Sequence, residues 1–325
     1  MKEDKKEDEK KLGHNAKTPF QIPIAGWKKI ALRVKDEIRL DNVIVVSAGV
    51  AFYFFLAFIP ALAASVSIYG LVVTPDQAEQ QMTQLADSLP EETYRLISTT
   101  LNRVAGQAGS TLSWSLVFSI LLSVWSSNRA TDAVFEAMNI AYDEKENRSF
   151  FKKKALTLLF TVAGGVIGIL SMVFIIAYPT IVNNFDLPEI LKTSLAQVRW
   201  LVLAAILFFV LAIIYKIAPF RSNPKFIWIV PGALLATLLW IGGSMLFALY
   251  IKHFGTFDRT YGSFAAVIIL MLWFFLSGFI IIMGAEVNSE IEHQTYVDTT
   301  VGPDKQMGER GAYHADNTTG QNKIF

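Results

Sequence analysis

The chain contains 325 residues, of which 53% are hydrophobic and only 18% are charged, and it has no cysteine. Soluble domains usually carry about 25% charged residues, so the composition argues against a cytosolic protein. The 29 basic and 28 acidic residues leave a formal charge of +1, which offers no positive excess to bind a nucleic-acid backbone. Without cysteine there is no disulfide or thiolate metal site, and the four histidines show no ligand spacing. We therefore expect no metal and no other cofactor.

The N-terminal part of the chain divides into two regions. Residues 1–22 begin with MKEDKKEDEKK, a run of mixed charges that predicts a disordered tail. In residues 23–42, Trp27, Ile30 and Val34 fall on one helical face that is surrounded by Lys and Arg. This pattern favours a helix lying in the inner membrane interface, with a plain cytosolic helix as the alternative.

Six long apolar segments follow, and a helix of about 20 residues crosses about 30 Å of hydrocarbon. The predicted spans cover approximately residues 43–73, 111–128, 155–182, 200–220, 226–251 and 261–285. Proline lacks a backbone donor, so we expect bent or interrupted helices at Pro60 in the first span and at Pro231 and Gly232 in the fifth. The sequence therefore predicts an all-α polytopic membrane protein with one membrane domain, residues 23–292.

The segments between the spans indicate how the chain is oriented. Lys and Arg concentrate on alternate sides of the predicted spans, and positive residues stay preferentially in the cytoplasm. Both termini are therefore predicted to be cytoplasmic. The largest outside loop, residues 74–110, should form short amphipathic helices, and the polar segment 293–325 should be a mobile cytoplasmic tail.

Four stretches of sequence carry a family signature. They are AFYFFLAFIPAL at 51–62, SNRATDAVFEAMNIAYDEKENRSF at 127–150, PGALLATLLW at 231–240 and YGSFAAVIILMLWFFLSGFIIIMGAEVN at 261–288. Together they resemble the YihY/BrkB family of bacterial inner-membrane proteins, over roughly residues 24–292. The resemblance implies a six-span plasma-membrane protein without a settled activity: some members have been labelled ribonuclease BN, others carry a virulence label, and a lipid-export role has been suggested for a relative.

The residues themselves do not support the ribonuclease label. Metal-dependent nucleases need clustered His, Asp or Glu ligands, and metal-free nucleases need a histidine or a similar acid–base pair. The candidate groups here lie on separate loops, with no basic binding face. We therefore expect no enzymatic activity and no catalytic residue.

Charged groups near the ends of the spans are the candidate functional groups, since a charge at mid-bilayer costs about 2.5–3.5 kcal/mol. The predicted cytoplasmic-side polar cluster consists of Arg129, Asp132, Lys216, Glu286 and Asn288. Within it, Arg129 can pair with Asp132 at i,i+3 spacing, and Glu286 can pair with Arg129 or Lys216. Simple ion pairs that fix helix ends are the alternative.

A second polar group is predicted on the outer side, between the fifth and sixth spans. Its members are His253, Asp258, Arg259 and Tyr261. An ordered turn is the preferred interpretation, ahead of a gate.

The sequence favours a protein that handles or transports a lipid or another amphiphilic anion. A basic inner rim would attract the headgroup, while apolar grooves between helices would hold the chains. The alternative is a non-transporting scaffold that binds envelope proteins or a second copy of itself. A small-solute channel is disfavoured because the spans offer few polar positions. Membrane lipids are the expected partners, and nucleic acid is not.

Overall fold

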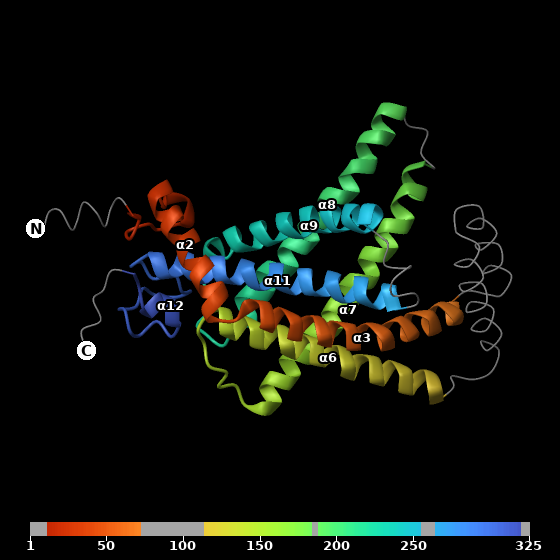
Figure 1. Ribbon diagram of the computed structural model, residues 1–325, viewed down its shortest axis with the longest axis horizontal. Coiled ribbons are helices and arrows are strands. Elements are labelled where there is room, and N and C mark those ends of the chain that lie inside the picture. Colours follow the sequence, from red (N-terminus) through yellow and green to blue (C-terminus); the bar gives the residue numbers. More distant parts are fainter. Residues whose placement is uncertain (1–11, 73–113, 184–187, 255–263, 320–325) are drawn as a thin grey trace, which may run out of the picture. The chain divides into compact units, whose positions relative to one another are not determined.

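The computed structural model describes residues 12–72, 114–183, 188–254 and 264–319 (Figure 1). Its elements are η1 (Pro19–Gln21), α2 (Ile24–Leu40), α3 (Val43–Val72), α6 (Trp114–Ala141), α7 (Phe150–Asn183), α8 (Glu189–Ile217), η2 (Phe226–Trp228), α9 (Val230–Phe254), α11 (Ala265–Gln294) and α12 (Tyr313–Asp316). Within these ranges there is no strand, only an isolated bridge between Pro224 and Thr300. The prediction of an all-α polytopic protein is confirmed.

Several of these helices are long and apolar enough to cross a membrane. Four of them contain such a segment on their own, namely α7, α8, α9 and α11, and a fifth candidate joins α2 to the first half of α3 through a 64° bend. The described residues thus contain four or five candidate spans, and they do not establish the predicted number of six. The helices predicted in the loop 74–110 lie outside the described residues.

The chain divides into two compact units, one formed by residues 1–52 with 131–325 and the other by residues 53–130. In the second unit, Ser126 on α6 donates a hydrogen bond to the carbonyl of Leu56 on α3, at 3.0 Å. The first unit contains most of the family signature and most of the features described below. We call it the main unit.

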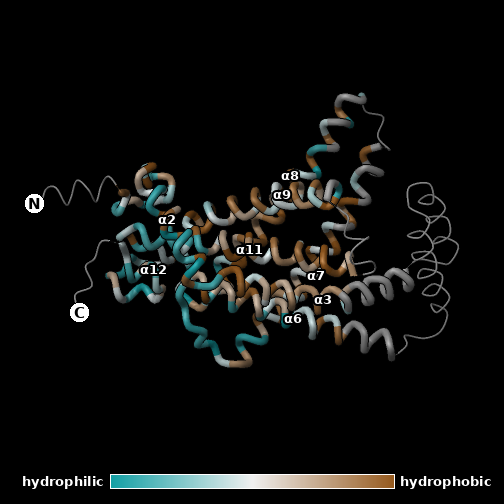
Figure 2. Tube along the Cα trace, viewed as in Figure 1, coloured by the Kyte–Doolittle hydropathy of each residue, from teal (hydrophilic) through white to brown (hydrophobic). Residues whose placement is uncertain are grey.

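Helix α11 organises the main unit, since it packs against α9, α2 and α12. Figure 2 shows hydrophobic residues along α7, α8, α9 and α11, whereas hydrophilic residues gather around α2 and α12. This separation arises because α11 is apolar over most of its length and ends in the polar sequence AEVNSEIEHQ. The N-terminal two thirds of α11 are apolar enough to lie in the membrane, whereas its C-terminal turns need polar partners from the protein.

The prolines predicted to bend or interrupt helices cause no break. Pro60 lies inside α3, which runs continuously from Val43 to Val72, and membrane helices tolerate a proline where other groups satisfy the carbonyl that it leaves free. Pro231 and Gly232 lie in the first turn of α9, which begins at Val230. The N–H groups of a first turn have no partner within the helix, so proline is accepted there without a break.

The apolar face of α2 is covered by protein. Ile30 and Val34 are buried in a cluster with Trp228 and Ile291, and Trp27 packs at its edge. This face was predicted to rest on lipid, but it packs against apolar side chains of the η2 turn and of the last turns of α11. The place of α2 in the membrane interface, against the alternative of a plain cytosolic helix, stays a prediction.

The described part of the N-terminal tail is folded, in contrast to the prediction of disorder for residues 1–22. The Nδ1 atom of His14 lies 2.8 Å from the carbonyl oxygen of Gln294, and Thr295 donates through Oγ1 to the carbonyl of Ala16 at 2.8 Å. The ring of His14 stacks on that of Tyr296, with 5.0 Å between centroids. These contacts use backbone groups at the end of α11, which a composition-based prediction cannot anticipate.

The segment after α11 is also folded, so the prediction of a mobile tail is wrong for residues 296–319. The buried guanidinium of Arg310 donates to the carbonyls of Ala315 and Tyr296, each at 2.7 Å. Asp298 accepts hydrogen bonds from the backbone of Thr300 and Lys305, each at 2.8 Å. This segment has no apolar face to hold it in place. Hydrogen bonds between its polar side chains and backbone groups stabilise it instead.

Candidate functional site

The last turns of α11 carry an unusual concentration of buried polar side chains. They are Glu286, Asn288, Ser289, Glu290, Glu292 and Gln294, none of which is more than 1% exposed. Buried polar groups are costly unless they are hydrogen-bonded or paired. Their partners come from α2, α9, the loop after α6, the loop after α8 and the C-terminal segment. We call this region the polar end of α11.

Two parts of the family signature meet at Asn288. Its Oδ1 atom accepts a hydrogen bond from the backbone N–H of Gly232 at 2.8 Å. Added to Gly232, a Cβ atom would lie 2.1 Å from the carbonyl oxygen of Gly284. Only glycine fits at this crossing, so the PGA sequence that begins α9 and the GAE-x-N sequence of α11 form one tight helix contact.

Glu286 has a different neighbour from the one that was expected. Asp41, which follows α2, lies beside it, and the Oε1 atom of Glu286 has no hydrogen-bond partner within the described residues. No ion pair joins Glu286 to Lys216 in the described part of the chain, and Arg129 belongs to the other unit. The predicted salt bridge of Glu286 to Lys216 is therefore wrong.

The strongest electrostatic feature is a buried ion pair between Arg221, in the loop after α8, and Glu292 on α11. The Nη2 and Oε1 atoms lie 2.7 Å apart, and both side chains are 0% exposed. Thr299 donates to the other carboxylate oxygen at 3.0 Å, and the guanidinium stacks 4.5 Å from the centroid of the Tyr142 ring. Burial alone lowers the pKa of Arg221, but the Glu292 carboxylate outweighs it and raises the pKa. The pair therefore stays charged.

The other residues predicted for the cytoplasmic cluster have partners of their own on α6 and α7 or lie at the end of α8. Asp132 pairs with Lys154 on α7, and the guanidinium of Arg129 stacks 5.6 Å from the ring centroid of Trp125. Lys216 is half-buried in the last turn of α8. The structure thus brings Glu286 and Asn288 together with partners that sequence analysis did not name.

The predicted outer group falls almost entirely outside the described residues. Asp258, Arg259 and Tyr261 are not described, and His253 is placed only as a backbone position near the end of α9.

A cleft of about 710 Å³, lined mostly by polar and charged residues, opens beside the Arg221–Glu292 pair. Its lining comes from the loop after α6, the loop after α8 and the C-terminal segment: Asp143, Glu144, Lys145, Asn147, Phe220, Arg221, Ser222, Gly311 and Tyr313. Two acidic and two basic side chains share this lining. Burial raises the pKa of Glu144, although its carboxylate accepts the N–H of Tyr313. The balanced charge favours neither an anion nor a cation.

An apolar groove lies between α7 and α8, and it has a volume of about 460 Å³. It is lined by Ile167, Leu170, Ser171 and Phe174 from α7 and by Val202, Ile206, Phe209, Val210 and Ile213 from α8. Both helices contain candidate membrane spans. Several lining side chains, such as Phe209 and Ile213, are exposed. We call this feature the α7–α8 groove.

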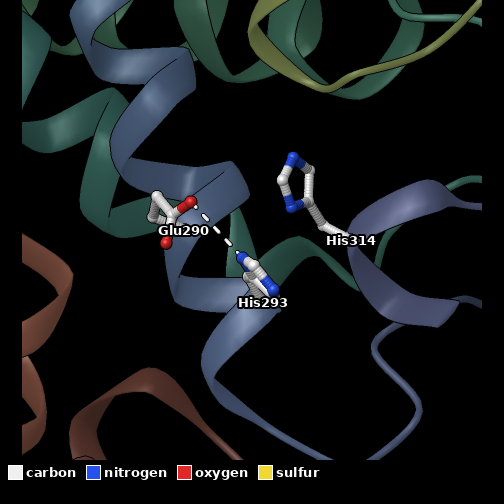
Figure 3. Close-up of side chains that lie close together, drawn as sticks. All are labelled: Glu290, His293 and His314. Atoms are coloured by element: carbon white, nitrogen blue, oxygen red, sulfur yellow. Dashed lines mark hydrogen bonds and ion pairs between the residues drawn. The ribbon is translucent and has the colours of Figure 1, made fainter. Parts of the chain in front are cut away.

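A group of possible metal ligands stands at the junction of α11 and α12. Glu290, His293 and His314 each offer one ligand atom, and these atoms all lie within 4.8 Å of one another (Figure 3). The sequence did not predict this group, because its third member, His314, lies in a segment that was predicted to be a mobile tail. The signal was Glu290-x-x-His293, a carboxylate and an imidazole one helical turn apart.

Comparisons with known proteins agree with the membrane fold. Residues 34–309 match the family described as virulence factor BrkB. The chain is 30% identical over 250 residues to the putative ribonuclease-like protein YfkH of Bacillus subtilis (strain 168), a match that covers 75% of this chain and 88% of YfkH. No solved structure matches the chain.

Two further relatives are named membrane proteins. A UPF0761 membrane protein of Chlorobium chlorochromatii (strain CaD3) is 28% identical over 253 residues, covering 76% of this chain and 56% of the relative. The UPF0761 membrane protein IL2447 of Idiomarina loihiensis is 28% identical over 160 residues, with 49% and 55% covered. The matches therefore span little more than half the length of these two relatives.

The family match continues past Glu292 to residue 309. It therefore includes the polar end of α11 and part of the folded C-terminal segment. The apolar helices, the contact between the PGA and GAE-x-N sequences and the extent of the match lead to one conclusion: the chain belongs to the virulence factor BrkB family and is a multi-pass membrane protein.

Proposed function

We propose that this protein binds a lipid or a similar amphiphilic anion and moves it within or across the membrane, without enzymatic chemistry. The observation that carries the proposal is the α7–α8 groove, whose lining is apolar except for Ser171. Because both helices contain candidate spans, the medium around the groove is hydrocarbon, and acyl chains are the occupants that its surface suits.

The charge at one end of the groove supports an anionic headgroup. Ile213 lines the groove and Lys216 follows three residues later, so the two side chains share a face of α8. Lys152, at the start of the neighbouring α7, is exposed. Arg148 fixes the two helix ends together, because its guanidinium donates to the carbonyls of Ile217, Ala218 and Pro219.

The groove should determine lipid retention. We expect native mass spectrometry of the protein released from nanodiscs to show bound anionic lipid for the wild type. The Ile206→Trp variant should retain far less, because the larger ring fills the groove. The Leu201→Trp variant is the matched control, since Leu201 lies on the same helix, is 70% exposed and does not line the groove.

The headgroup contribution is tested by Lys216→Ala, which should reduce the preference for anionic over zwitterionic lipid. Lys252→Ala, an exposed lysine at the end of α9, should leave this preference unchanged. Equal retention by the wild type and Ile206→Trp would contradict the proposal. Absence of selective lipid binding by the wild type would move the scaffold function ahead.

We infer further that both termini face the cytoplasm of a bacterial inner membrane and that the chain crosses the membrane six times. Contacts of His14 and Ala16 with the end of α11 support termini on one side, which requires an even number of crossings. The abundance of Lys and Arg before α3 supports the cytoplasmic side.

The absence of cysteine in the chain makes this orientation easy to test. A single cysteine introduced at Val301, which is 60% exposed, should resist a membrane-impermeant thiol reagent added to intact spheroplasts and react after lysis. Labelling of intact spheroplasts would contradict the proposed orientation.

A further inference from the structure

We propose that Glu290, His293 and His314 form a binding site for a divalent transition metal, with zinc as the best fit. The three ligand atoms come from two elements, α11 and α12, that are joined by residues 295–312. Two imidazoles and one carboxylate are a donor set that zinc accepts, with a fourth position left for water. Imidazole nitrogen ligands suit this class of metal better than magnesium or calcium.

The two ligands on α11 already stand at the spacing that a metal requires. The Nδ1 atom of His293 lies 3.4 Å from the Oε1 atom of Glu290, one helical turn away. Around a tetrahedral zinc with bonds of about 2.0–2.1 Å, neighbouring ligand atoms lie about 3.3 Å apart. The largest separation in the group, 4.8 Å or less, closes with a shift of about 1.5 Å of the His314 ring, which lies across from the pair in Figure 3.

His314 provides the second, independent observation. Its side chain is only 4% exposed, and its Nδ1 atom is buried without a hydrogen-bond partner in the described structure. In Figure 3 this ring faces Glu290 and His293. A buried imidazole nitrogen that no group satisfies is costly, and a metal at the centre of the group would satisfy it.

The other nitrogen of His314 faces a carboxylate. Its Nε2 atom lies 3.4 Å from the Oδ2 atom of Asp143. Histidine ligands of metals usually place their second nitrogen against a carboxylate in this way.

Glu290 is oriented by a neighbour as well. Arg33 on α2 forms an ion pair with the Oε2 atom of Glu290 and donates to its backbone carbonyl at 3.1 Å. The second oxygen, Oε1, remains directed at His293. The carboxylate of Glu37 interacts electrostatically with Glu290, His314 and Asp143. The negative charges of Glu37 and Asp143 offset the positive charge of Arg33, so a cation can bind beside Glu290.

A metal at this position would connect α12 to the polar end of α11. The C-terminal segment would then be held by a coordinate bond in addition to the hydrogen bonds of Arg310 and Asp298. Binding to the folded state alone stabilises that state by mass action. The metal would therefore stabilise the docked C-terminal segment.

Zinc binding to the full-length protein in detergent tests the proposal directly. The protein is purified without a polyhistidine tag, stripped with a chelator and titrated with zinc, and binding is followed by calorimetry and by metal analysis after gel filtration. We expect one zinc per chain. His314→Ala and His293→Ala should each weaken binding by more than about 100-fold, because loss of even an outer partner of a metal ligand costs about 10- to 100-fold.

Matched variants keep the test decisive. His253→Ala removes a histidine from the far end of α9 and should bind zinc as the wild type does. His293 is 25% exposed, so His293→Ala should fold even if His314→Ala does not. Less than one zinc per wild-type chain, or equal zinc affinity of the wild type and His293→Ala, would overturn the proposal.

Discussion

Replacing Arg221 with alanine is expected to destabilise the main unit by about 3–5 kcal/mol, the cost of leaving one partner of a buried ion pair uncompensated. Glu292 would keep its charge at a position that is 0% exposed, with only Thr299 to bind it. The stacking of the guanidinium on Tyr142 would also be lost. The free energy of unfolding in detergent, measured by denaturant titration, gives the value.

Two further variants show whether the buried charge is the cause. Lys225→Ala removes the exposed pair with Asp304 and one hydrogen bond to the carbonyl of Asp298, and it should change the free energy of unfolding by only about 1–2 kcal/mol. The double variant Arg221→Met with Glu292→Leu should recover much of the stability, because it leaves no buried charge alone. A loss for Arg221→Ala no larger than that for Lys225→Ala would contradict the structure of this pair.

Replacing Gly232 with alanine should separate α9 from α11 and cost about 1–3 kcal/mol or more, the range for overpacking a tight core. The added Cβ atom would lie 2.1 Å from the carbonyl oxygen of Gly284 and 2.5 Å from the Cγ atom of Asn288. Backbone atoms of α11 cannot move as a flexible side chain would. The hydrogen bond from the Gly232 N–H to Asn288 should be lost at the same time.

Gly242 supplies the control on the same helix. A Cβ atom added there meets nothing within 4 Å, and alanine is favoured over glycine in a helix by about 0.5–1 kcal/mol. Gly242→Ala should therefore leave the unfolding midpoint in detergent unchanged or raise it slightly, while Gly232→Ala lowers it. Equal midpoints for the two variants would contradict the tight helix crossing.

The long helices could be predicted because a membrane-spanning helix is recognised from a local stretch of sequence alone. A span needs an uninterrupted run of apolar residues, and the run predicted at 43–73 corresponds to α3, Val43–Val72. Folding of the two terminal segments could not be predicted in this way. His14 and Arg310 are held by backbone carbonyls that lie far from them or beyond a turn, and composition contains no information about such contacts.

The candidate site was predicted in part for a similar reason. Depth along a helix placed Glu286 and Asn288 in a polar cluster at the end of the last apolar segment, but depth does not say which helices adjoin. The partners of these residues, Asp41 and Gly232, lie on segments distant in sequence. Arg221 was counted as an ordinary loop charge. Nothing near it in the sequence indicates that its side chain is buried and paired with Glu292.

The movement of lipid between the two leaflets tests the central claim most directly. The protein is reconstituted into liposomes that contain a fluorescent anionic lipid, and a membrane-impermeant quencher reports the fraction that has crossed. We predict that the wild type and Leu201→Trp accelerate crossing over protein-free liposomes and that Ile206→Trp, with the α7–α8 groove filled, does not. A wild-type rate equal to that of protein-free liposomes, or an unchanged rate in Ile206→Trp, would contradict the account.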